Sequence, residues 1–147
     1  YVASLGEPID TYWVTGSSAP CLSLFKPLWM IEDEPLTFSE DNTKEAVAYW
    51  KRQEELYRSI LEQRIPIDEY KKDRDQLEML IMDKVNTIDF EVDDSKQMTS
   101  IMDYALVEEK KLQDYYLDQA KGTKPNLQGN MYFNHYWKKM NRKLGFN

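Results

Sequence analysis

Apolar side chains follow two different periods along this 147-residue chain. Before about residue 30 they form three short runs that are rich in β-branched and aromatic residues: Val2–Leu5, Thr11–Thr15 and Leu22–Met30. Turn-forming residues separate the runs, and this arrangement is typical of β-strands. The first thirty residues are therefore predicted to form two or three strands.

Beyond about residue 42 the apolar positions recur every three or four residues, which predicts amphipathic helices. Four such stretches follow: about Asn42 to Arg64, Pro66 to about Val85, about Asp93 to the break at Gly122 and Pro125, and about Asn130 to Leu144. Asn42 with Glu45 indicates a capping box, Pro66 fits the first turn of the second helix, and Gly145 is a natural stop for the fourth.

The apolar stripes of these helices define the predicted core. Its members are Val47, Trp50, Tyr57, Ile60, Leu61, Ile67, Tyr70, Leu77, Leu80, Ile81, Val85, Met98, Ile101, Met102, Ala105, Leu112 and Tyr116. Met79, Met82, Met98 and Met102 are interpreted as flexible core filler. The i,i+4 pair of Glu54 and Arg58 is interpreted as a solvated surface pair.

These elements predict an α+β fold, with two or three N-terminal strands followed by a bundle of about four helices. Residues 1–30 form the strand segment and residues 31–147 the helical region. A two-stranded piece is only marginally stable in water. The strands are therefore expected to complete a larger sheet, whose other part is either an upstream part of the same protein or a second copy.

Composition restricts the possible partners and the compartment. The net charge of −7 argues against a general nucleic-acid binder. The basic run at residues 138–143 is interpreted as a complement to a helix C-terminus. No apolar run approaches the roughly 20 residues that span a bilayer, so no membrane partner is expected. Cys21 is the single cysteine, which excludes an internal disulfide and fits a reducing, cytoplasmic location.

Residues with catalytic chemistry are sparse. Cys21 and the lone His135 are the possible nucleophile and base, but no Asn or Asp is marked as an orienting partner, so they are interpreted as ordinary side chains. One Cys and one His provide too few ligands for zinc, and residues 15–20 lack the ending of a phosphate-binding loop. The chain is therefore expected to hold no metal, no cofactor and no complete active site.

Two segments carry a family resemblance. The first, WVTGSSAPCLSLFKPLWM (residues 13–30), has a Thr-Gly step at the end of a strand and a Ser-x-Phe-Lys-Pro element in the next. The second, AVAYWKRQEELYRSIL (residues 46–61), is a predicted helix. Both segments resemble the secernin and cysteine-type dipeptidase family of N-terminal-nucleophile hydrolases. The matching positions are Thr15, Gly16, Ser23, Phe25, Lys26, Pro27, Trp50, Glu55 and Arg58.

The resemblance implies that this chain is the C-terminal part of a longer amide hydrolase with an αββα sandwich. In such enzymes a cysteine at the mature N-terminus attacks the amide carbonyl of a small peptide, and its own α-amino group serves as the base. Cys21 lies in the turn that the family varies, so it does not match that nucleophile. The chain alone is therefore expected to be inactive and to contribute sheet strands and a helical cap.

Two alternatives stay open. Lys26 either pairs with an acidic group near the active site or is an edge-strand lysine that deters aggregation. The chain as a whole could instead be a standalone acidic helical interaction module with no catalytic activity.

Overall fold

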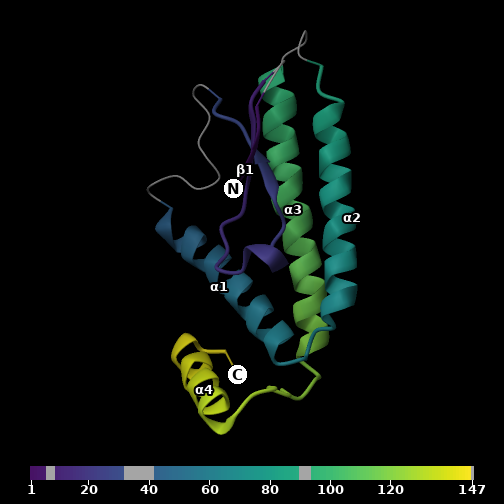
Figure 1. The fold of residues 1–147 in the computed structure, drawn as a ribbon. Helices are drawn as coiled ribbons and strands as arrows, with labels where there is room; N and C mark the ends of the chain where they lie inside the picture. Colours follow the sequence, from purple (N-terminus) through teal and green to yellow (C-terminus); the bar gives the residue numbers. More distant parts are fainter. Residues whose placement is uncertain (6–8, 32–41, 90–93, 147) are drawn as a thin grey trace.

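The computed structural model describes residues 1–5, 9–31, 42–89 and 94–146. In these ranges three short strands precede four α-helices (Figure 1), which confirms the predicted α+β class. The elements are β1 (Val2–Ser4), β2 (Thr11–Val14), the 3-10 turn η1 (Pro20–Leu22), β3 (Lys26–Leu28), α1 (Thr43–Leu61), α2 (Ile67–Asn86), α3 (Asp94–Ala120) and α4 (Met131–Leu144).

The three strands form one antiparallel sheet in the order β1-β2-β3. Trp13 at its centre lies opposite Val2 on one side and Pro27 on the other. The predicted strand over Leu22–Met30 is too long, because Pro20 opens a 3-10 turn in which the Leu22 amide donates to the Ala19 carbonyl at 3.0 Å. Extended pairing begins only at Lys26.

The sheet shares a core with the long antiparallel pair α2 and α3, beside which it lies in Figure 1. Leu24 and Trp29, on either side of β3, are buried to 1% and 2% exposure. Their cluster also contains Leu77 and Ile81 of α2, Met98, Ile101 and Ala105 of α3, and Ile88, which follows the end of α2. The three strands thus pair with one another within the chain, and the residues that flank β3 are buried against α2 and α3. This packing stabilises a sheet that would be only marginally stable alone.

A second core cluster joins α1 to the same helix pair. It contains Leu22, Leu56, Ile60, Ile65, Tyr70 and Tyr116. Tyr70 and Tyr116 meet edge to face with ring centroids 5.3 Å apart, a favoured aromatic geometry. Both hydroxyls have partners, since Tyr70 donates to the Leu22 carbonyl and Tyr116 donates to Asp73.

The helix boundaries follow the predicted signals closely, with two corrections. The Asn42 side chain bonds the Glu45 side chain and not a backbone amide, so the predicted capping box does not form. Pro66 is the N-cap of α2 and lies just before its first turn. At α4 the predicted stop is confirmed, since Gly145 ends the helix at φ 77°. The helix begins next to the predicted start, and there the Asn130 side chain accepts from the Phe133 amide at 2.9 Å.

Several residues of the predicted stripes are exposed and not buried. Val47, Trp50, Ile67, Met79, Leu80 and Met82 all expose 38% or more of their surface. These residues lie on the parts of α1 and α2 that the other described elements leave uncovered, so their side chains face solvent. Met98 is buried as predicted, and Met102 is half-buried. No helix in the described ranges is both long and apolar enough to cross a bilayer.

Candidate functional site

Four polar side chains meet in the interior and form what we call the Lys26 cluster: Lys26, Tyr49, Gln53 and Glu109. Lys26 Nζ lies 2.8 Å from Glu109 Oε2 and 2.8 Å from the Tyr49 hydroxyl. The Tyr49 hydroxyl donates to Glu109 Oε2 at 3.0 Å, and Gln53 Nε2 donates to Glu109 Oε1 at 2.9 Å. Both carboxylate oxygens are therefore bonded.

Local sequence explains how these residues converge. Lys26 is the first residue of β3 and alternates with Phe25 and Pro27, so its side chain leaves the sheet on the opposite face. Tyr49 and Gln53 are one turn apart on α1 and share a side of that helix. Glu109 occupies the apolar stripe of α3, four residues after Ala105. The cluster thus connects the sheet to two helices.

Burial determines what the Lys26 cluster can do. Lys26, Gln53 and Glu109 are 7%, 3% and 2% exposed, respectively. Desolvation, followed by the adjacent Glu109 carboxylate, raises the pKa of the Tyr49 phenol, so Tyr49 stays protonated and acts as a donor. A buried ion pair whose hydrogen-bonding groups are satisfied in this way holds its surroundings in place. The hypothesis that Lys26 is an edge-strand lysine that deters aggregation is therefore wrong, because its side chain is buried although β3 lies at the edge of the sheet.

The turn after β2 packs along α1, beside the Lys26 cluster. A Cβ atom at Gly16 would lie 3.2 Å from Cε1 of Tyr49, so the backbone approaches that ring closely. Two residues on, the Ser18 hydroxyl donates to Glu54. The Thr15 hydroxyl is buried and has no hydrogen-bond partner among the described residues. An unpaired buried hydroxyl of this kind costs about 1–3 kcal/mol.

A second buried group, the Arg58 cluster, consists of Glu54, Arg58, Glu62 and Asn141. Arg58 bonds Glu54 on its own helix at 3.2 Å and donates to Asn141 of α4 at 2.6 Å. The Asn141 amide in turn donates to Glu62, also at 2.6 Å. Each of the four is 5–8% exposed, which contradicts the prediction of a solvated Glu54–Arg58 pair. The reason is that α4 covers this side of α1, with Trp137 stacked 5.0 Å from the guanidinium.

The other family-matched positions are dispersed. Ser23 is buried and donates to the Ala19 carbonyl at 3.0 Å, while Pro27 is buried in β3. Trp50 is 38% exposed, and Glu55 is half-buried outside both clusters. Of the matched residues, the structure thus brings together Gly16 and Lys26, which meet at Tyr49. Arg58 belongs to the other cluster.

The two residues considered as a possible nucleophile and base, Cys21 and His135, lie on different elements. Cys21 is an exposed free thiol in η1, and His135 is exposed on α4. No set of three or more potential metal ligands gathers anywhere in the described part of the chain.

Sequence reasoning missed Tyr49, Gln53, Glu109 and Asn141. Glu109 had a detectable signal, because an acidic residue in an apolar helical stripe must find a buried partner. No equivalent signal marks Tyr49 or Gln53.

No protein-family model, no curated protein and no solved structure shows significant similarity to this chain. The family resemblance therefore depends on the two quoted segments themselves and on how they are arranged.

Proposed function

We propose that this chain is the C-terminal part of an amide-hydrolysing, dipeptidase-like enzyme, to which it contributes sheet strands and a helical cap without the nucleophile. The main support is that the two segments carrying the resemblance contact each other. The Thr-Gly step and the Phe-Lys-Pro element both reach Tyr49, which lies within the second segment. Two matches that are independent in sequence thus belong to one packed unit.

In this proposal the Lys26 cluster has a positioning role. Its ion pair fixes the start of β3 between α1 and α3, so the sheet has a defined orientation toward the helices. Buried ionic groups can select one arrangement over its competitors even when they add little net stability. Lys26 thus orients the sheet, and it is not a catalytic residue.

Two features fit an attachment to further chain. Among the described residues no strand pairs with the outer edge of β1, and such an edge offers free backbone groups to another strand. The Thr15 hydroxyl also lacks a partner in the same ranges. An upstream part of the same protein, or a second copy, would pair with the edge. The substrate would be a small peptide, no cofactor is required, and the free thiol of Cys21 favours a cytoplasmic location.

The test begins with the protein purified from its natural source. We expect its intact mass to exceed the 17.5 kDa of this chain and its mature N-terminus to be cysteine. We also expect it to hydrolyse dipeptides, with activity abolished by iodoacetamide, whereas the 147-residue chain is inactive. Dipeptide hydrolysis by the 147-residue chain that Cys21→Ser abolishes would overturn the proposal, as would a natural polypeptide of 17.5 kDa without activity.

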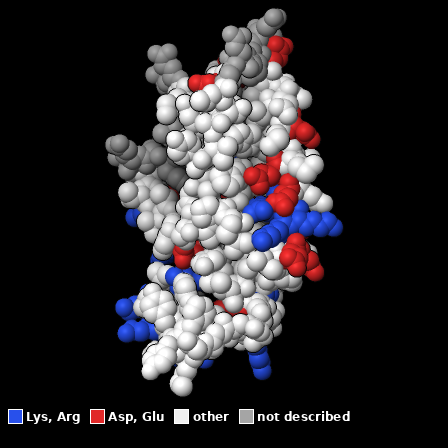
Figure 2. Space-filling view, viewed as in Figure 1, with Lys and Arg blue, Asp and Glu red and all other residues white. Residues whose placement is uncertain are grey.

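A specific observation favours the alternative of an interaction module. The C-terminal helix carries exposed Met131, Tyr132 and Tyr136 next to a group of Lys and Arg residues, and Figure 2 shows basic side chains at that end of the molecule. A module of this kind would stay monomeric and fold without residues 1–30. The burial of Leu24 and Trp29 in the shared core argues against the second requirement. Retention of a cooperative melting transition after deletion of 1–30 would favour the module.

A further inference from the structure

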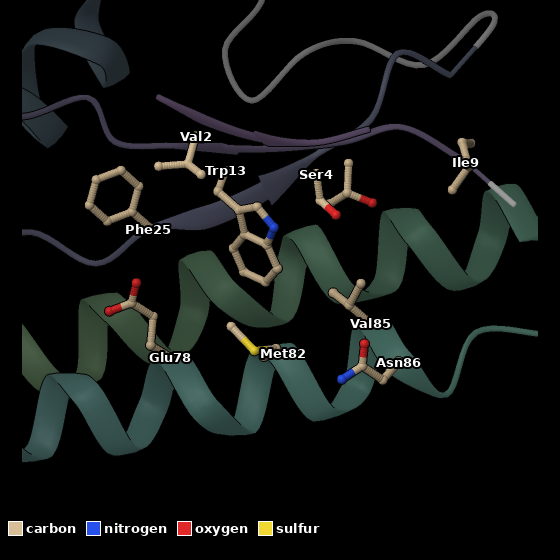
Figure 3. Close-up of a pocket in the computed structure, with 10 residues that line it drawn as sticks. Val2, Ser4, Ile9, Trp13, Phe25, Glu78, Met82, Val85 and Asn86 are labelled. Atoms are coloured by element: carbon tan, nitrogen blue, oxygen red, sulfur yellow. The ribbon is translucent and has the colours of Figure 1, made fainter. Parts of the chain in front are cut away.

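A cavity of about 580 Å³ lies between the sheet and α2 (Figure 3). Trp13 projects from the sheet toward the helices, and apolar side chains surround it, among them Phe25, Met82 and Val85. Ser4, Thr11 and Asn86 add polar groups to the lining. Binding sites for small molecules typically have this size and this mixture of an apolar lining with a few polar groups.

Glu78 is the sole charged side chain among the ten residues that line this cavity. It lies near the Phe25 end of the cavity in Figure 3 and accepts a hydrogen bond from the Phe25 backbone amide. Desolvation raises the pKa of the Glu78 carboxyl, which is a sign that its charge is incompletely compensated.

The nearest cation, Arg74, compensates the charge of Glu78 only in part. Arg74 Nε is 3.9 Å from the Glu78 carboxylate, beyond hydrogen-bonding distance. The guanidinium instead bonds Asp75 and the Cys21 carbonyl. Acceptor capacity therefore remains on Glu78, at the edge of an aromatic cavity.

We propose that this cavity binds a small organic amine, with the ammonium group at Glu78 and an apolar body against Trp13. A carboxylate beside an aromatic face suits a cation with an apolar substituent, since the ion pair and the cation–π attraction act together. Anionic ligands are disfavoured because the lining offers no Lys or Arg. This site is independent of the proposed hydrolase role, and its test does not depend on activity.

The probe is 2-phenylethylamine, titrated into the isotopically labelled 147-residue chain and followed by amide and indole NMR shifts. We expect saturable shifts at Trp13, Phe25 and Val85, with a millimolar or tighter dissociation constant. The neutral analogue 2-phenylethanol should bind about two- to fivefold more weakly, as expected for losing a partly exposed charge pair. Absence of saturable binding, or equal affinity for the two probes, would overturn the proposal.

Three variants sharpen the result. Glu78→Gln keeps the shape of the side chain and should remove the preference for the amine. The matched control Glu69→Gln, at an exposed position of the same helix, should leave it unchanged. Ser4→Phe places an aromatic ring in the cavity from an exposed strand position and should abolish binding of both probes. If Glu78→Gln retained the full preference, the ammonium would not be at Glu78 and the proposal would be wrong.

Discussion

The Lys26 and Arg58 clusters contain similar chemical groups but connect different elements of the fold. Each has a buried ion pair and a neutral amide, and each includes residues of α1. The Lys26 cluster connects the sheet, α1 and α3 at the centre of the fold. The Arg58 cluster pairs two residues of the same helix and then reaches α4, the helix that lies apart from the others in Figure 1. The first cluster is part of the common core, whereas the second attaches one peripheral helix.

The difference shows that burial of a charged side chain does not by itself indicate how much of the fold depends on it. The dependence is set by the number of helices and strands that the charged side chain connects. We therefore expect damage at Lys26 to affect the entire fold and damage at Asn141 to stay local. Three predictions test this comparison.

The largest effect is expected for Lys26→Met. The substitution leaves the Glu109 carboxylate buried without its cation, which should lower the free energy of unfolding by roughly 3–5 kcal/mol. Urea denaturation should show this loss in one cooperative transition. The double variant Lys26→Met with Glu109→Leu should recover most of it, because no charge is then stranded. Lys110→Met, at the exposed position beside Glu109, is the control and should leave the free energy of unfolding nearly unchanged.

A loss below about 1 kcal/mol for Lys26→Met would show that the fold does not depend on the Lys26 cluster.

An intermediate effect is expected for Asn141→Leu. It removes one hydrogen-bond partner of Arg58, which keeps Glu54, and one of Glu62, which keeps Arg64. The loss should cost about 1–3 kcal/mol. Hydrogen exchange should accelerate in the amides of α4 while those of α2 and α3 keep their protection. Lys139→Leu, two residues earlier and exposed, should leave exchange unchanged. Faster exchange throughout the molecule would mean that the two clusters are equivalent.

The smallest effect is expected for Gly16→Ala. The added methyl group would press on the Tyr49 ring at 3.2 Å. Overpacking of this kind costs about 1–3 kcal/mol, and the restriction of the unfolded chain by alanine offsets about 0.4–1 kcal/mol of that cost. With the overpacking near the lower end of its range, the net loss of stability should be roughly 0.5–1 kcal/mol. Gly122→Ala is the matched control, since no atom lies within 4 Å of its added carbon. Thermal melting of the two variants side by side gives the difference. Equal melting temperatures would show that the turn has room to move away from α1.

The helices could be predicted from the sequence because their signals are local. Asn130 and Gly145 bound α4 through caps formed within a few residues, and Met98, Ile101 and Ala105 follow the helical period. The extent of the third strand could not be predicted, because the 3-10 turn at Pro20 competes with a strand whose residues have suitable propensities.

The polar clusters were mostly out of reach of sequence reasoning. Glu54 and Arg58 have the spacing of an ordinary surface pair, and only the docking of α4 makes them buried. Lys26 was recognised as costly to bury, but its partner lies in another helix, 83 residues away. Neither local propensity nor periodicity encodes a pairing over that distance.

This separation also affects the order of events during synthesis. On a ribosome that adds about 5–20 residues per second, Glu109 is made roughly 4–17 seconds after Lys26. During that interval the nascent strands lack the α3 surface that later covers them, and their unpaired edges and apolar side chains are accessible to chaperones or to neighbouring chains. The translation speed between β3 and α3 therefore becomes a variable that influences the yield of native protein.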